Sequence, residues 1–148
     1  MVRTQHPGEL TVAESLQLLS EVRFGRVVFT SRALPAVKPV RHVLSDGEIV
    51  IAAGPELVFG PASQAAESGP PPETIVAYEA DQLDATGRSG WSVVVVGRAR
   101  PITDKNELSR YRGLLPPTTV PDQLVGISAE VVSGFRLVSE DDAIPARH

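Results

Sequence analysis

Two segments of the chain have the spacing of apolar residues that is typical of amphipathic helices. Residues 10–22 repeat apolar side chains every three or four positions, and Thr11 is followed three residues later by Glu14, which is the capping-box pattern. Asp104 followed by Glu107 begins a second segment with the same signal. We therefore predict two short helices. The apolar face of the first is predicted to hold Val12, Leu16 and Leu19.

Most of the remaining chain is rich in β-branched residues and predicts strands. Residues 25–31 and 32–44 form the first two strands, and the two prolines of the second suit an edge or a bulged strand. The dipeptide Asp46-Gly47 then favours a tight hairpin turn. The other predicted strands are residues 48–53, 74–83, 90–103 and 123–137.

The segment 54–73 does not show a strand pattern. A helical stretch from about Glu56 to Ser68 is interrupted by a Gly-Pro pair and closed by three consecutive prolines. We expect an irregular loop with one helical stretch. In the last strand, Gly126 and Gly134 are the predicted points of a bulge or bend.

Alternation along residues 36–43 divides one strand into two faces, neither of which is cleanly polar. Residues 93–96 are all valine, so both faces of that later strand are apolar, which predicts burial on both sides. A second covering layer is needed in so small a domain, and a homodimer that packs barrel against barrel would provide it. The strand at residues 32–44 has Val37, Pro39, Arg41 and Val43 on one face and Ala36, Lys38, Val40 and His42 on the other.

About six strands, hairpin connections and two peripheral helices predict a mainly β (α+β) fold, a barrel or sandwich. A length of 148 residues fits one domain. We expect residues 1–148 to form that single domain, with a core at about 9–137 and a polar C-terminal tail.

Composition narrows the function classes. The net charge of −4 gives no general attraction to phosphate backbones, so nucleic acid is not an expected partner. No window approaches the roughly 18 apolar residues of a membrane span, and the N-terminus has no apolar signal core, so we expect a cytoplasmic protein. The chain contains no cysteine, and its histidines at 6, 42 and 148 lack the spacing of metal ligands.

The order of the segments resembles a known family. The blocks "GRVVF", "YEAD" and "GWSVVVVGRA", in this order after a capped helix, are similar to those of the pyridoxamine 5′-phosphate oxidase-like family, the FMN-binding split β-barrels. The resemblance spans about residues 9–137. It implies a six-stranded split barrel that forms a homodimer, with two flavin sites at the interface between the subunits.

The resemblance also implies a set of cofactor contacts. The flavin would lie against the strand that holds "PVRH" and the start of the returning strand "IVIAA". FMN is the expected cofactor, the substrate is a small molecule, and the chemistry belongs to the flavin. The expected cofactor-binding residues are Val40, Arg41, His42, Ile51, Ala52, Ala53 and Trp91.

Three of these residues have alternative roles. Arg41 could contact the flavin ring or its phosphate, or it could pair with an acid of the partner. His42 could donate to a flavin carbonyl, or it could be a packed residue with a satisfied ring nitrogen. Trp91 could reach the cofactor across the dimer, or it could anchor the interface.

The sequence departs from the family pattern at the end of the returning strand. Related chains carry basic and hydroxyl residues there, whereas this chain reads Ala52, Ala53, Gly54, Pro55, Glu56. A phosphate dianion needs charge-assisted donors, which these residues do not supply. The main hypothesis is a flavin-dependent oxidoreductase. The alternative is a non-catalytic split-barrel binding module that has lost the FMN phosphate site.

Overall fold

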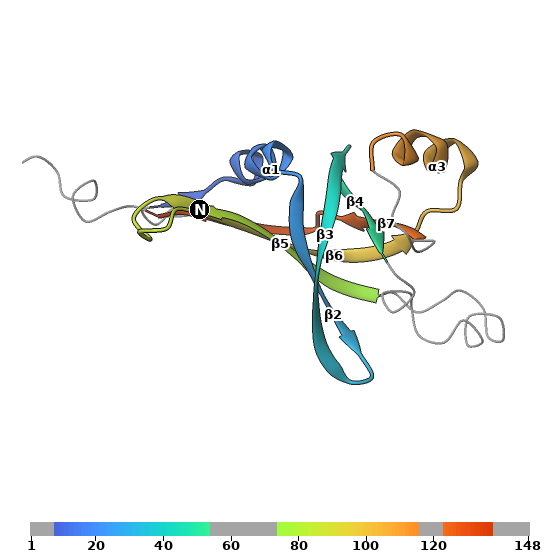
Figure 1. Ribbon diagram of the computed structural model, residues 1–148, viewed down its shortest axis with the longest axis horizontal. Coiled ribbons are helices and arrows are strands. Elements are labelled where there is room, and N and C mark those ends of the chain that lie inside the picture. Colours follow the sequence, from blue (N-terminus) through green and yellow to red (C-terminus); the bar gives the residue numbers. More distant parts are fainter. Residues whose placement is uncertain (1–7, 54–73, 116–122, 138–148) are drawn as a thin grey trace, which may run out of the picture.

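The computed structural model describes residues 8–53, 74–115 and 123–137, which form one antiparallel sheet and two helices (Figure 1). The predicted loop and helical stretch at 54–73 and the C-terminal tail lie outside the described residues. The elements are β1 (Glu9–Leu10), α1 (Val12–Glu21), β2 (Phe24–Ser31), β3 (Leu34–Ser45), β4 (Glu48–Ala53), β5 (Thr74–Leu83), β6 (Gly90–Pro101), α3 (Lys105–Arg112), β7 (Gln123–Ser128) and β8 (Val131–Arg136).

Six of the strands close into a barrel. Their order around the ring is β2, β3, β4, β7, β6 and β5, and β5 pairs again with β2. The strand β6 makes this closure possible because it changes partner along its length: Trp91–Val96 pair with β8, whereas Ala99–Pro101 pair with β7. The predicted six-stranded split barrel with peripheral helices is confirmed.

The C-terminal segment differs from the single strand predicted for residues 123–137. It forms two strands, β7 and β8, which pair with opposite ends of β6. The chain leaves the ladder at Ala129 and Glu130, so the break lies there and not at Gly126 or Gly134. Both glycines lie within their strands, where a Cβ would crowd the Glu48 carboxylate in one case and the Ser15 side chain in the other.

Alternate residues of β2, β5 and β6 fill the barrel interior, whereas β4 and β7 also bury residues of their other face against α3. Val93 and Val95 point into it and are fully buried, whereas Val94 and Val96 are half-buried on the outer face. Buried interior residues include Val27, Phe29, Val40, Ile49, Ile51, Val76, Tyr78, Trp91, Val93, Val95, Val125 and Ile127.

The hairpin turn between β3 and β4 confirms another prediction. Asp46 and Gly47 both have the predicted left-handed conformation.

The helix α1 begins where the sequence predicts. The Thr11 hydroxyl accepts from the Glu14 amide at 3.1 Å, and the Glu14 carboxylate accepts from the Thr11 amide at 2.9 Å. The buried face is rotated from the expected one, because Val12 is 54% exposed while Ser15 and Leu19 are fully buried. Ser15 tolerates this position because its hydroxyl donates to the Thr11 carbonyl at 2.8 Å.

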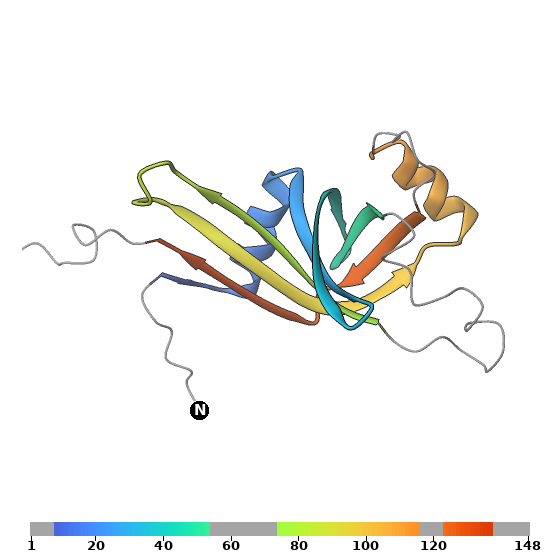
Figure 2. The same cartoon turned by 60° about the horizontal axis from the view of Figure 1, so that its bottom comes forward.

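The helix α3 lies beside β4 and β7, at the end of the barrel away from α1, as Figure 2 shows. Its Tyr111 packs in a second apolar cluster with Val50, Ile102 and Leu124. Asp104 caps the helix by accepting from two backbone amides, again as predicted. Within the described residues, neither helix is long and apolar enough to cross a membrane.

Candidate functional site

The seven predicted cofactor residues do not share one face. Five of them point into the barrel; among these, Trp91 is 5% exposed and packs in the core of its own barrel. The side chains of Arg41 and Ala52 face outward instead. The inward-facing residues are Val40, His42, Ile51, Ala53 and Trp91.

His42 is the most constrained of the interior residues. Its Nε2 lies 2.9 Å from the Leu19 carbonyl oxygen, and its Nδ1 lies 2.5 Å from the Tyr78 hydroxyl. A carbonyl can only accept, so Nε2 carries the proton and Nδ1 accepts from the tyrosine. Both ring nitrogens are therefore occupied by the fold. A contact between His42 and a flavin would have to break one of these bonds.

The surroundings of this pair favour its neutral form. Burial lowers the pKa of His42 below its ordinary value of 6.5, against the raising effect of the Leu19 and Val22 carbonyls. Burial also raises the pKa of the Tyr78 hydroxyl far above its usual range. The pair thus ties the end of α1 to the barrel interior and holds no charge near neutral pH.

Arg41 lies on the outer face of β3 and is half-buried. Its cross-strand neighbour is Phe24 of β2, whose ring is 65% exposed. Cross-strand neighbours share a face of the sheet, so an exposed aromatic side chain and an arginine here give a flat ligand a surface on which to stack.

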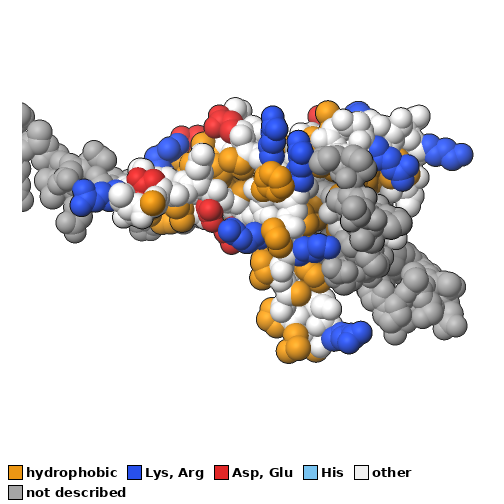
Figure 3. Space-filling model, in the orientation of Figure 1, with side chains coloured by type: hydrophobic (Ala, Val, Ile, Leu, Met, Phe, Trp, Pro, Cys, Tyr) orange, Lys and Arg blue, Asp and Glu red, His pale blue; other side chains and the backbone are white. Residues whose placement is uncertain are grey.

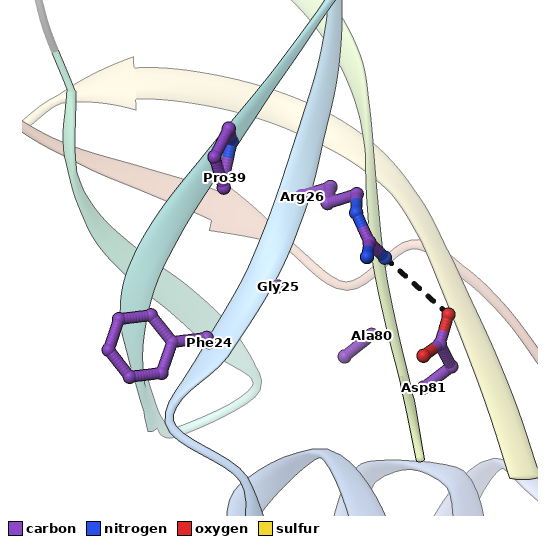
Figure 4. A pocket seen from close by; sticks show the side chains of 6 residues that line it. All are labelled: Phe24, Gly25, Arg26, Pro39, Ala80 and Asp81. Atoms are coloured by element: carbon purple, nitrogen blue, oxygen red, sulfur yellow. Dashed lines mark hydrogen bonds and ion pairs between the residues drawn. The ribbon is translucent and has the colours of Figure 1, made fainter. Parts of the chain in front are cut away.

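A hollow opens on the same outer face, next to Phe24. Its volume is about 210 Å³. Figure 4 shows its lining: Phe24, Arg26 and Pro39 come from β2 and β3, and Asp81 comes from β5, opposite them. The remaining lining residues are Gly25 and Ala80.

The hollow exists because β2 and β5 separate at this point. Their ladder comprises only three residue pairs and ends at Arg26 opposite Glu79. Gly25 lies just beyond that end, and a Cβ there would come within 2.5 Å of the Tyr78 ring. The glycine therefore lets the tyrosine pack directly beneath the strand that borders the hollow.

Two carboxylates flank the arginine at the polar side of the hollow. Arg26 Nη1 lies 3.3 Å from Glu79 and 3.5 Å from Asp81. The neighbouring Asp81, by hydrogen bonding, and burial both raise the pKa of Glu79, whereas Arg26 lowers it. With both carboxylates ionised, these three side chains sum to a charge of −1.

Beside this polar group, an apolar row crosses five strands of the outer face. Each member is the direct cross-strand neighbour of the next, from β3 through β2, β5 and β6 to β8. Its two end residues, Val37 and Val131, are 60% and 63% exposed. Figure 3 shows hydrophobic side chains gathered on the projecting β2–β3 hairpin and above it. The apolar row consists of Val37, Val28, Ala77, Val96 and Val131.

Sequence reasoning did not select the residues that line the hollow. Alternation in β2 puts Phe24 and Arg26 on the face opposite the buried Val27, which was a usable signal. The pairing of β2 with β5, which brings Asp81 to Arg26, is a contact between residues 55 positions apart. Local patterns do not reveal that contact.

Comparisons with known proteins agree with this architecture. The model of a family described as pyridoxamine 5′-phosphate oxidase matches residues 11–139. An uncharacterised protein of Mycobacterium tuberculosis is 42% identical over 134 residues, which cover 89% of this chain and 86% of that protein.

Solved structures share the fold at lower identity. The FAD binding protein from Mycobacterium smegmatis is 24% identical, with a TM-score of 0.65 and coverage of 90% of this chain and 99% of that one. A conserved protein of unknown function from Corynebacterium diphtheriae is 26% identical, with a TM-score of 0.67 and coverage of 88% and 96%. The extent of the family match and the closure of the six strands lead to one conclusion: this chain belongs to the pyridoxamine 5′-phosphate oxidase family.

Proposed function

We propose that the protein binds a flavin on the outer face of β2, β3 and β5, and that it is a flavin-dependent oxidoreductase acting on a small molecule. The observation that carries this proposal is the hollow lined by the exposed Phe24, whose cross-strand neighbour on the same outer face is Arg41. The family membership and the FAD-binding proteins of the same fold from Mycobacterium smegmatis and Mesorhizobium loti support it.

We further propose that the site is completed by a second copy of the chain. A volume of about 210 Å³ is below the roughly 300 Å³ at which pockets for whole small molecules begin. One chain would therefore enclose only part of a flavin. The apolar row beside the hollow gives a second copy a surface to pack on, and a two-fold dimer would place the same residues on both sides.

The residues present fit the ring of a flavin better than its phosphate. Phe24 and Pro39 offer apolar surfaces to a flat ring, and Arg41 offers one guanidinium for stacking or for an anion. At the end of β4, the side chains of Ala52 and Ala53 carry no donor. A bound flavin would supply hydride or electron transfer. The chain's own part would be to bind the ring, orient it and exclude water.

Replacing Arg41 with alanine tests the orientation of the ligand. If the guanidinium contacts the phosphate, FMN binding should weaken by about 1 to 3 kcal/mol, whereas riboflavin, which lacks the phosphate, should bind unchanged. Quenching of flavin fluorescence in a titration measures both affinities. The matched control is Arg112→Ala, which removes an exposed arginine of α3. An unchanged FMN affinity in Arg41→Ala would remove Arg41 from the site.

A second candidate function is a non-catalytic binding module built on the same barrel. The alanines at the end of β4 favour it, because they leave a phosphate with fewer donors there. Purified protein that is yellow supports the flavoprotein. Colourless protein that does not quench added FMN or riboflavin supports the module.

A further inference from the structure

The polar side of the hollow combines a donor and an acceptor at short range. Figure 4 shows Arg26 reaching across from β2 toward Asp81 on β5, with Phe24 and Pro39 on the β2–β3 side. The guanidinium and the carboxylate lie 3.5 Å apart at their nearest atoms. A flat ligand in the hollow would thus meet apolar surface along its faces and one hydrogen-bonding pair at its edge.

Both members of this pair have hydrogen-bonding capacity to spare. A guanidinium has five N–H donors, and both ion pairs of Arg26 use the same nitrogen, Nη1. Their lengths of 3.3 and 3.5 Å are at the long end for hydrogen bonds. A carboxylate has about four lone-pair sites, so Asp81 can accept from a ligand while it stays near Arg26.

A contribution to folding stability alone does not explain why two carboxylates surround Arg26. The Arg26 side chain is 50% exposed, and exposed ion pairs contribute little to folding. The Asp81 carboxylate also disfavours ionisation of the Glu79 carboxylate, since Asp81 raises the pKa of Glu79. Two acids around one arginine leave a charge of −1, which disfavours an anionic group in the hollow and favours a ligand edge that carries an N–H.

We propose that the hollow recognises the cyclic imide edge, CO–NH–CO, of a flat heteroaromatic ring. Asp81 accepts the ring N–H, and Arg26 donates to the adjacent ring carbonyl. Glu79 keeps Arg26 turned toward the hollow. The flavin ring has such an edge, so this inference rests on the proposed function and assigns its specificity to Arg26 and Asp81. Any phosphate of the ligand lies outside the hollow, away from the two carboxylates.

Two uncharged flavins that differ by one methyl group test this assignment. Lumiflavin has the imide N–H, whereas 3-methyllumiflavin has a methyl group in its place, and neither carries a phosphate. We expect the full-length protein to bind lumiflavin at least about tenfold more tightly in a fluorescence titration, since a hydrogen bond to a charged group is lost with the methyl compound. Asp81→Ala should remove that preference by weakening lumiflavin alone.

The matched control is Glu130→Ala, which removes a carboxylate that pairs with Arg98 outside the hollow and should leave the preference intact. Circular dichroism checks that each variant is folded. Equal binding of the two flavins by the unmodified protein would overturn the assignment and leave flavin binding standing, as would a preference that survives in Asp81→Ala. If no flavin binds, including riboflavin and FMN, the proposed function itself fails and the assignment fails with it.

Discussion

Replacing Gly97 with alanine is expected to lower the free energy of unfolding by about 3 kcal/mol or more. Gly97 lies where β6 passes from its pairing with β8 to its pairing with β7. A Cβ at this position would overlap the carbonyl oxygen of Ser128. Because that atom belongs to the backbone, the neighbouring strand itself would have to move, and the barrel would close less well.

Chemical denaturation followed by circular dichroism measures this loss. The matched control is Gly113→Ala at the end of α3, where the backbone is helical and the nearest atom to a Cβ is 3.6 Å away. We expect the control to be close to neutral. If Gly97→Ala were as stable as the control, the close approach of β6 and β7 would be wrong, and with it the closure of the barrel.

His42→Ala is expected to lower the free energy of unfolding by about 3 kcal/mol or more. The substitution removes a ring that is 4% exposed and leaves a cavity in the core. It also leaves the Tyr78 hydroxyl and the Leu19 carbonyl without the partners they have now. Tyr78→Phe, which removes one hydroxyl and keeps the ring, should cost less, about 1 to 3 kcal/mol.

The pH dependence of the same variant tests the protonation state of His42. The pKa of His42 is lowered by folding, so the unfolded chain takes up a proton first as the pH falls below 6.5. The stability that the neutral ring contributes is present above that pH and is lost below it. The difference in stability between the unmodified protein and His42→Ala should therefore narrow as the pH drops. A difference that stays constant would mean that folding does not lower the pKa of His42, and a difference that widens would mean that folding raises it.

Local patterns predicted the elements well because each signal is a local contact. The capping box at Thr11, the N-cap at Asp104 and the turn at Asp46-Gly47 depend on residues a few positions apart. The division of the last segment into β7 and β8 was not predicted, because it depends on which end of β6 each part joins. Pairing between residues far apart in the sequence decides which end of β6 each part joins.

The candidate site was harder to predict than the fold. Alternation correctly separated Arg41 from His42, but it did not say which face was the interior. Once β3 is in the barrel, His42 joins the core and Arg41 faces outward beside Phe24. The acid that completes the hollow, Asp81, comes from a strand that meets β2 over only three residue pairs. Its position depends on where that ladder ends.

A crystal structure of the full-length protein grown with riboflavin tests the central claim most directly. We predict a flat ring against Phe24 and Pro39, its polar edge toward Arg26 and Asp81, with a second copy packed on the apolar row. A ring bound at another place on the barrel would contradict the account. So would a dimer seam filled by side chains that leaves no room for a ring beside Phe24.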